Sequence, residues 1–203
     1  MSKLHICSFV SLSVVCLLHL GAAPVGAQEA APCIMCHGEA SNFAGSPDSA
    51  SLVVTAESFE GSVHGEAGMP CTSCHAGLSF PHPENPPVVE CGACHSGIAE
   101  QYEASLHGYA LARGNADAPT CTDCHGVHDI LHSTDPLSRS SHANTALLCA
   151  ECHSHEFVPE AEGALVPPQV FESFQTSVHG LNEVLGAANC TDCHGVHDMR
   201  GAR

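Results

Sequence analysis

The chain has 203 residues, with 14 Cys and 17 His against 7 Phe, 2 Tyr and no Trp. Lys and Arg number 5 and Asp and Glu 22, which gives a formal charge of −17 at pH 7. A chain this acidic has no basic face for tracking phosphates, which argues against binding to nucleic acid or to anionic lipid surfaces. So few aromatic side chains also predict that something other than side chains fills the interior.

Residues 1–27 are predicted to form an export signal that is cleaved from the mature protein. Lys3 supplies the positive start, Ile6–Leu20 is mostly apolar, and Val25-Gly26-Ala27 offers a small-residue cleavage site. An uncleaved membrane anchor is the less favoured alternative, because the apolar run is short and contains His19. We therefore expect no membrane span after cleavage and a periplasmic or extracellular location.

Beyond this segment every cysteine belongs to a Cys-x-x-Cys-His motif, and there are six such motifs. Two thiols three residues apart can each add to one vinyl group of a haem, and the next histidine then lies under the iron as its proximal ligand. Structural disulfides, zinc sites and redox-active thiol pairs are alternatives, but none explains a histidine after all six pairs. The sequence therefore predicts six covalently bound haem c groups.

The residues assigned to these groups are read directly from the motifs. The attachment cysteines are Cys33, Cys36, Cys71, Cys74, Cys91, Cys94, Cys121, Cys124, Cys149, Cys152, Cys190 and Cys193. The proximal histidines are His37, His75, His95, His125, His153 and His194.

At this density the haems themselves should form the core, because each porphyrin offers a large flat apolar surface. The expected fold is mainly α with extensive loops: a haem-cored protein with short helices and little or no sheet. Haems packed this closely must lie within electron-tunnelling reach of one another.

A longer pattern recurs three times along the chain. It reads Phe/Tyr-x-x-Ser-x-His-Gly followed by a Cys-x-x-Cys-His motif, and its copies begin at Phe59, Tyr102 and Phe174. The second and third copies continue with Gly-Val-His-Asp, whereas the first does not. Since each copy is preceded by one further motif, we predict three di-haem modules, a divergent one at 28–88 and two others at 89–138 and 139–203.

Two helices are expected to carry this pattern. The first is Gly97–Arg113, closed by Gly114, and the second is Pro168–Leu185, which has proline near its first turn and ends before a glycine. On such helices the aromatic ring can pack on a porphyrin while the histidine reaches an iron. Segments 40–56, 78–90 and 156–168 read as loops.

The distal ligands decide whether such a chain is an electron carrier or an enzyme. Of the nine histidines left after the signal and the motifs are set aside, six fit the repeat: His64, His82, His107, His128, His179 and His197. Each could instead hydrogen-bond a propionate or face solvent. The remaining His132, His142 and His155 have no repeat partner and are interpreted as bystanders.

His82 departs from the pattern, because it follows His75 by seven residues instead of three. His128 and His197 lie too close to their own proximal histidines to cap the same haem easily. Cross-ligation to a neighbouring haem is therefore the expected arrangement.

The run Tyr102-Glu-Ala-Ser-Leu-His107-Gly, followed by Cys121-Thr-Asp-Cys-His-Gly-Val-His128-Asp-Ile130 and Asp135-Pro136-Leu-Ser138, resembles the multihaem c-type cytochromes of bacterial respiratory chains. It is similar to the broad class that includes the cytochrome c3 and paired Cys-x-x-Cys-His groups, and the resemblance covers almost all of the mature chain. It implies covalent haem c, bis-histidine irons and electron transfer outside the cytoplasmic membrane.

The expected function is that of an electron-transfer protein with no catalytic residues, working in an anaerobic type of respiratory chain. Expected partners are redox proteins: a quinol-oxidising membrane cytochrome or other cytochromes, and a terminal reductase. One alternative is a reductase of nitrite, hydroxylamine or a sulfur oxyanion with one open haem, which the divergent first module could supply. Another is a homo-oligomer, or a subunit of an extracellular cytochrome filament.

Overall fold

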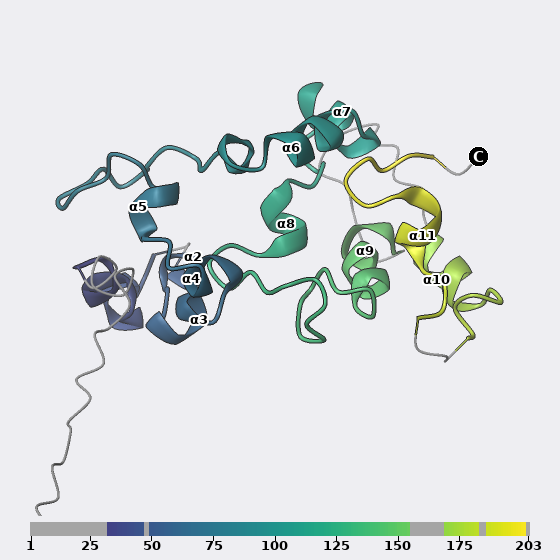
Figure 1. Ribbon diagram of the computed structural model, residues 1–203, viewed down its shortest axis with the longest axis horizontal. Helices are drawn as coiled ribbons and strands as arrows, with labels where there is room; N and C mark the ends of the chain where they lie inside the picture. The colour runs from purple at the N-terminus through teal and green to yellow at the C-terminus, as the bar shows by residue number, and fades with distance from the viewer. Residues whose placement is uncertain (1–31, 47–48, 155–168, 183–185, 202–203) are drawn as a thin grey trace, which may run out of the picture.

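The computed structural model describes residues 32–46, 49–154, 169–182 and 186–201. Within these ranges the chain consists of short helices joined by loops, with no strand. Figure 1 shows an elongated molecule in which the sequence runs broadly from one end of the long axis to the other. The mainly α fold with short helices is confirmed.

The helices follow one another closely. After a helical turn at 32–37, they are η1 (Ala40–Phe43), α2 (Ser49–Leu52), α3 (Ala56–Glu60), α4 (Val63–Glu66), α5 (Cys71–Cys74), η2 (Cys91–Ala93), α6 (Ser96–Glu103), α7 (Leu106–Ala112), α8 (Cys121–His125), α9 (Thr145–His153), α10 (Val170–Gln175) and α11 (Cys190–His194).

These helices are too short to be stable on their own. The longest described, α9, has 9 residues, and isolated helices below about 12–15 residues are marginal in water. Side-chain burial does not compensate, since Ala118 is the only hydrophobic residue buried among those described. The fold therefore needs a large apolar component besides its side chains, as the composition predicted.

The predicted helix Gly97–Arg113 is wrong as a single element, because it breaks into α6 and α7. Ser105 adopts an extended conformation (ψ 170°) between the two helices and accepts a hydrogen bond from the Gly108 N–H at 3.1 Å. Its own N–H donates to the Tyr102 carbonyl at 2.9 Å. A serine hydroxyl that caps a new helix competes with continuation of the old one, and here the cap prevails.

The other element predictions have mixed outcomes. The predicted helix 168–185 is much shorter in the structure, where α10 ends at Gln175, and residues 168 and 183–185 lie outside the described part. The predicted loop 40–56 contains η1 and α2, so that prediction is wrong in part. Segment 78–90 has no helix or strand, and 156–168 lies outside the described residues.

The glycine of each Ser-x-His-Gly element permits the sharp break between helices. A Cβ at Gly65, Gly108 or Gly180 would lie 1.9, 2.1 or 2.1 Å from the carbonyl oxygen of the repeat's aromatic residue. No side chain can be accommodated at that distance. The break is therefore fixed by a serine and a glycine, and it determines where the intervening histidine lies.

Across the described ranges, none of the helices has both the length and the apolar character that a membrane crossing requires.

Candidate haem sites

The motifs lie on helical turns that place both cysteines of a pair together. In α5, α8, α9 and α11 the two cysteines are three residues apart on a helix, and so lie on one face. All twelve cysteines of the six motifs are free thiols, none of them in a disulfide. Among the described residues there is also no group of three or more His, Cys, Asp or Glu side chains that could hold a metal ion.

A capping box starts the motif helix of the second and third copies. Asp123 Oδ2 accepts from the Thr120 N–H at 2.6 Å, and Asp192 Oδ2 accepts from the Asn189 N–H at 2.7 Å. The Thr-Asp between the two cysteines is thus explained by local helix capping.

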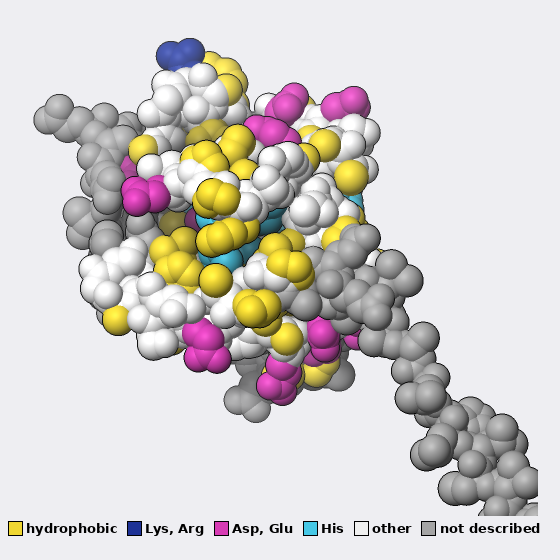
Figure 2. Space-filling model, turned by 90° about the vertical axis from the view of Figure 1, so that its left-hand side faces the viewer, with side chains coloured by type: hydrophobic (Ala, Val, Ile, Leu, Met, Phe, Trp, Pro, Cys, Tyr) yellow, Lys and Arg dark blue, Asp and Glu magenta, His cyan; other side chains and the backbone are white. Residues whose placement is uncertain are grey.

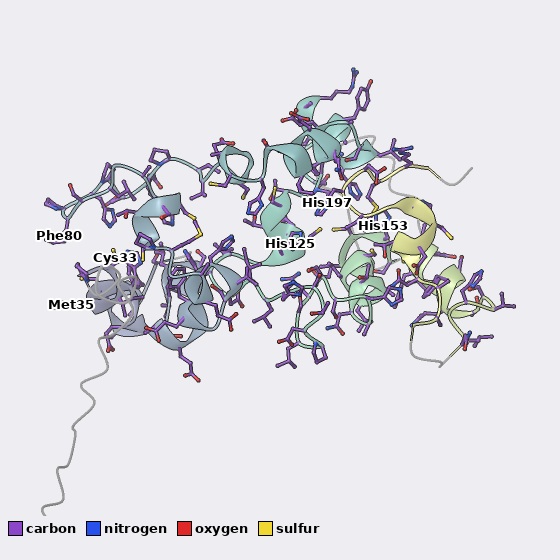
Figure 3. The ribbon with its side chains drawn as sticks, in the orientation of Figure 1. Cys33, Met35, Phe80, His125, His153 and His197 are labelled. Carbon is purple, nitrogen blue, oxygen red and sulfur yellow. The ribbon has the colours of Figure 1, made fainter. Side chains whose placement is uncertain are left out.

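Five of the six motif histidines face a second histidine. The angles between the ring planes range from 21° to 60°, and the ring centroids lie 5.9–6.2 Å apart. The pairs are His37 with His82, His64 with His95, His75 with His128, His107 with His153, and His125 with His197. Figure 3 shows His125 on α8 with His197 near it, and His153 on α9.

This separation is the one that two ligands of a single iron need. A metal–imidazole bond of about 2.0 Å, plus about 1.1 Å from nitrogen to ring centre, puts two trans imidazole centroids about 6.2 Å apart. Rings stacked directly on each other would be much closer. The five pairs therefore fit a haem iron between each two rings.

Backbone carbonyls orient several of these rings. Nδ1 of His37 lies 2.8 Å from the Leu52 carbonyl oxygen, and Nδ1 of His82 lies 2.9 Å from that of Pro83. In the sixth motif Nδ1 of His194 lies 2.8 Å from the Arg200 carbonyl oxygen. A ring that donates from Nδ1 keeps Nε2 unprotonated, which is the form that binds a metal.

Burial favours the neutral form of five of the paired imidazoles by lowering their pKa. Desolvation, followed by the charge of the facing His153, lowers the pKa of His107. Desolvation is likewise the leading cause that lowers the pKa of His75, His125, His128 and His153. Neutral imidazoles are the ones available to ligate iron at pH 7.

The sites follow one another in sequence order. Within each predicted module, the first cysteines of the two motifs lie close enough to interact: Cys33 with Cys71, Cys91 with Cys121, and Cys149 with Cys190. Between modules the thiols are also close enough to interact, since Cys74 contributes to raising the pKa of Cys91, after burial and Cys121. Cys152 does the same for Cys124, after burial, Asp123 and the opposing effect of Arg139. The six motifs thus form one row, consistent with the three predicted modules, whose boundaries stay a prediction.

In four of the five imidazole pairs, a histidine of one repeat copy faces a histidine of the next copy or of the motif that directly precedes that next copy. His64 and His75 of the first copy face His95 and His128, which lie further along the chain. A glycine allows this, because Gly126 after α8 has φ 82° and turns the chain away from its own motif. This geometry supports the expected cross-ligation.

The sixth motif histidine differs from the others. Among the described residues no histidine ring faces His194 at the distance seen in the five pairs. His179, a predicted distal ligand, is exposed and has no such partner there either. The structure therefore brings together five of the six predicted distal histidines with a motif histidine. The unmatched site lies in the third copy and not in the divergent first module.

The predicted bystanders have other contacts. Nδ1 of His132 lies 2.8 Å from the Thr134 hydroxyl, and Nε2 of His142 lies 3.0 Å from Asp192 Oδ2. His155 lies outside the described residues.

Several large apolar side chains are exposed to solvent. Met35, Phe80 and Leu137 are 77–87% exposed. Figure 2 shows histidines lying in a hollow among apolar side chains, with acidic side chains around the edge of that face. Porphyrin faces would cover such surfaces and supply the missing apolar core.

A family model described as Cytochrome c3 matches residues 63–154. That stretch begins at α4 and ends just after α9, so it contains four of the six motifs. No curated protein and no solved structure matches the chain. With the motifs and the short-helix fold, the match supports a multihaem c-type cytochrome, and residues 63–154, less than half of the chain, are similar to cytochrome c3.

Sequence reasoning did not assign a role to the repeat serines, which turn out to position the ligands. Ser62 and Ser105 are only 1% and 2% exposed. The Ser62 hydroxyl donates to the Phe59 carbonyl at 2.7 Å and accepts from the Gly65 N–H at 3.1 Å. Their recurrence one residue before each Leu/Val-His-Gly was the signal that could have shown this role.

Proposed function

We propose that the protein is a hexahaem electron conduit in which six haem c groups form one row, at least five of them with two histidine ligands. A multihaem cytochrome of this class transfers electrons, and the family match supports that coarser function. The observation that carries the finer proposal is the set of five imidazole pairs at 5.9–6.2 Å, in sequence order along an elongated molecule.

When bound, each haem supplies an iron that changes oxidation state by one electron. The chain's own residues do the rest. Paired imidazoles would ligate an iron from both sides and would favour a low potential compared with a His/Met pair, which suits outer-sphere transfer. The twelve motif cysteines would attach successive porphyrins through thioether bonds and so keep them close together.

The wider setting is also a proposal. Export by the 1–27 segment would place the protein in the periplasm or outside the cell, in an anaerobic type of respiratory chain. Cytochromes and a terminal reductase are the proposed partners, and the formal charge of −17 favours partners with a basic docking face.

Voltammetry of a tethered protein tests the row. We propose attaching the holoprotein to gold through a Leu181→Cys substitution, since Leu181 is 69% exposed and lies in the third copy. Fast scans should pass six electrons per molecule. Removing the third haem with Cys91→Ala/Cys94→Ala should leave only the three haems of motifs four to six exchanging electrons rapidly with the electrode.

The matched control removes an end haem instead. Cys33→Ala/Cys36→Ala should leave five haems in fast exchange. If the third-haem variant also kept five fast haems, the row would not be the electron path.

A reductase is the weaker candidate function. Its one supporting observation is that no described imidazole faces His194, so that iron could be open to a substrate. Turnover of nitrite, hydroxylamine or a sulfur oxyanion by the reduced holoprotein would support it.

A further inference from the structure

The same backbone hydrogen bond, which we call a joint, occurs twice between successive repeat copies. The Val63 N–H, directly after the buried Ser62, donates to the Ile130 carbonyl at 2.8 Å. The Leu106 N–H, directly after Ser105, donates to the Met199 carbonyl at 3.0 Å. In both joints the accepting carbonyl comes two residues after a distal histidine.

Each joint also completes an imidazole pair. His128 and His197, from the accepting segments, face His75 and His125 of the preceding copy at 6.1 and 5.9 Å. A Gly-Val-His-Asp-Ile/Met segment therefore does two things at once. It accepts a backbone hydrogen bond beside the Ser-x-His-Gly turn and places its histidine opposite the motif histidine of that copy.

The third copy repeats the capped turn and the motif histidine, and the described residues place no Gly-Val-His-Asp segment on them. The Ser177 hydroxyl caps its turn by accepting from the Gly180 N–H at 3.2 Å, as in the other copies. Among the described residues, however, no carbonyl accepts from the Val178 N–H and no imidazole faces His194. The Val178 side chain is 81% exposed.

We propose that the capped turn of Ser177, Val178 and His179, together with His194, binds a Gly-Val-His-Asp segment of another multihaem cytochrome. The histidine of that segment would be the second ligand of the iron that His194 would bind, in the haem that Cys190 and Cys193 would attach. The proposal rests on the proposed function and names the class of its partner. The occupant is identified by the two joints inside the chain, where segments of this sequence sit on the equivalent turns.

A second copy of this chain is a poor occupant. Both of its Gly-Val-His-Asp segments are already used at the internal joints. Its first copy continues from His75 with Ala-Gly-Leu and has no such segment. The partner is therefore a different cytochrome that carries the segment at its docking end.

A peptide titration of the full-length oxidised holoprotein tests this inference. The probe is acetyl-Gly-Val-His-Asp-Met-amide, with free imidazole and the His→Ala peptide as comparisons. EPR should show one high-spin iron among six haems. The peptide should convert it to low spin at a concentration about tenfold or more below that of imidazole, and the alanine peptide should not convert it.

Val178→Pro separates docking from simple ligation. Proline lacks the N–H that the joint uses, yet it is tolerated at the first position of a helical turn. In this variant the peptide should need about the same concentration as imidazole to convert the iron to low spin, and the affinity for imidazole should be unchanged. An unchanged advantage, or a peptide no better than imidazole, would overturn the proposal.

A low-spin iron at this site in the untreated protein would also overturn it. If His179→Ala then produced the high-spin signal, His179 would be the ligand from within the chain. None of these outcomes contradicts the proposed electron conduit. That proposal would be contradicted by fewer than six haems or by high-spin signals from the five other irons.

Discussion

At the scale of single residues, the chain contains 17 histidines. The group that faces each imidazole ring distinguishes the predicted iron ligands from the bystanders. His107 is half-buried and lies opposite His153 at 6.2 Å, whereas His132 is hydrogen-bonded to a nearby threonine. The repeat pattern in the sequence already made this distinction. It could not say which two rings meet, because the partners come from different copies and their meeting depends on the turns between helices.

His107→Ala should therefore leave exactly one more iron without its sixth ligand. The expected result is one additional high-spin iron with all six haems retained, since the cysteines are unchanged. EPR spin quantitation with a pyridine haemochrome count measures both. His132→Ala is the matched control and should leave the spectrum as it is; an equal change in both variants would contradict the assignment.

His128→Met should raise the potential of a single haem. Methionine opposite histidine favours the reduced iron, so one of the six potentials should move upward, by a fraction of the roughly 0.8 V that axial ligands span. Spectroelectrochemical titration shows the shift. A potential that stays in place would mean that His128 does not ligate the iron of His75.

At the scale of elements, the break between helices positions the ligand histidines. The sequence predicted one helix over 97–113 because its helix-forming residues run on through Ser105. The capping bonds of that serine and the absence of a side chain at Gly108 outweigh this preference. The motif turns, in contrast, were predictable, because the cysteine spacing itself requires them.

Gly108→Ala should disrupt the second copy. Its Cβ would lie 2.1 Å from the Tyr102 carbonyl oxygen, so α6 and α7 could not keep their present angle. We expect a loss of thermal stability and a high-spin signal from the iron between His107 and His153. Gly97→Ala in α6 is the control, because nothing lies within 4 Å of its Cβ; it should be neutral or stabilising by up to about 1 kcal/mol.

The cap of α11 should make the third copy acid-sensitive. Hydrogen bonds from the Asn189 backbone and then from His142 lower the pKa of Asp192. A lowered pKa in the folded state contributes stability above the ordinary aspartate value of about 3.9, and that stability is lost as the pH falls through the folded value.

Melting temperatures of wild type and Asp192→Asn between pH 7 and pH 3 test this effect. The wild type should be the more stable at pH 7, and the difference should shrink on acidification. A difference that is independent of pH would show that the carboxylate charge has no part in the cap.

At the scale of the whole molecule, a row of haem sites on an acidic chain defines both a path and a preferred partner charge. Composition was enough to predict the acidic charge and the shortage of buried apolar side chains. The order of the sites was not predictable, because it rests on contacts between cysteines of neighbouring motifs, such as Cys149 with Cys190.

The charge should appear in the kinetics of small redox reagents. Oxidation of the reduced protein by the cation hexaammineruthenium(III) should slow as salt is added, and oxidation by the anion ferricyanide should become faster. Stopped-flow measurements over a range of ionic strengths give both slopes. The same slope for both reagents would show that the charge does not steer encounters.

The most direct test of the central claim is EPR of the oxidised holoprotein together with a count of haem per chain. The account predicts six haems, of which at least five are low-spin because two imidazoles hold each iron. Fewer than six haems, or high-spin signals from more than one iron, would contradict it.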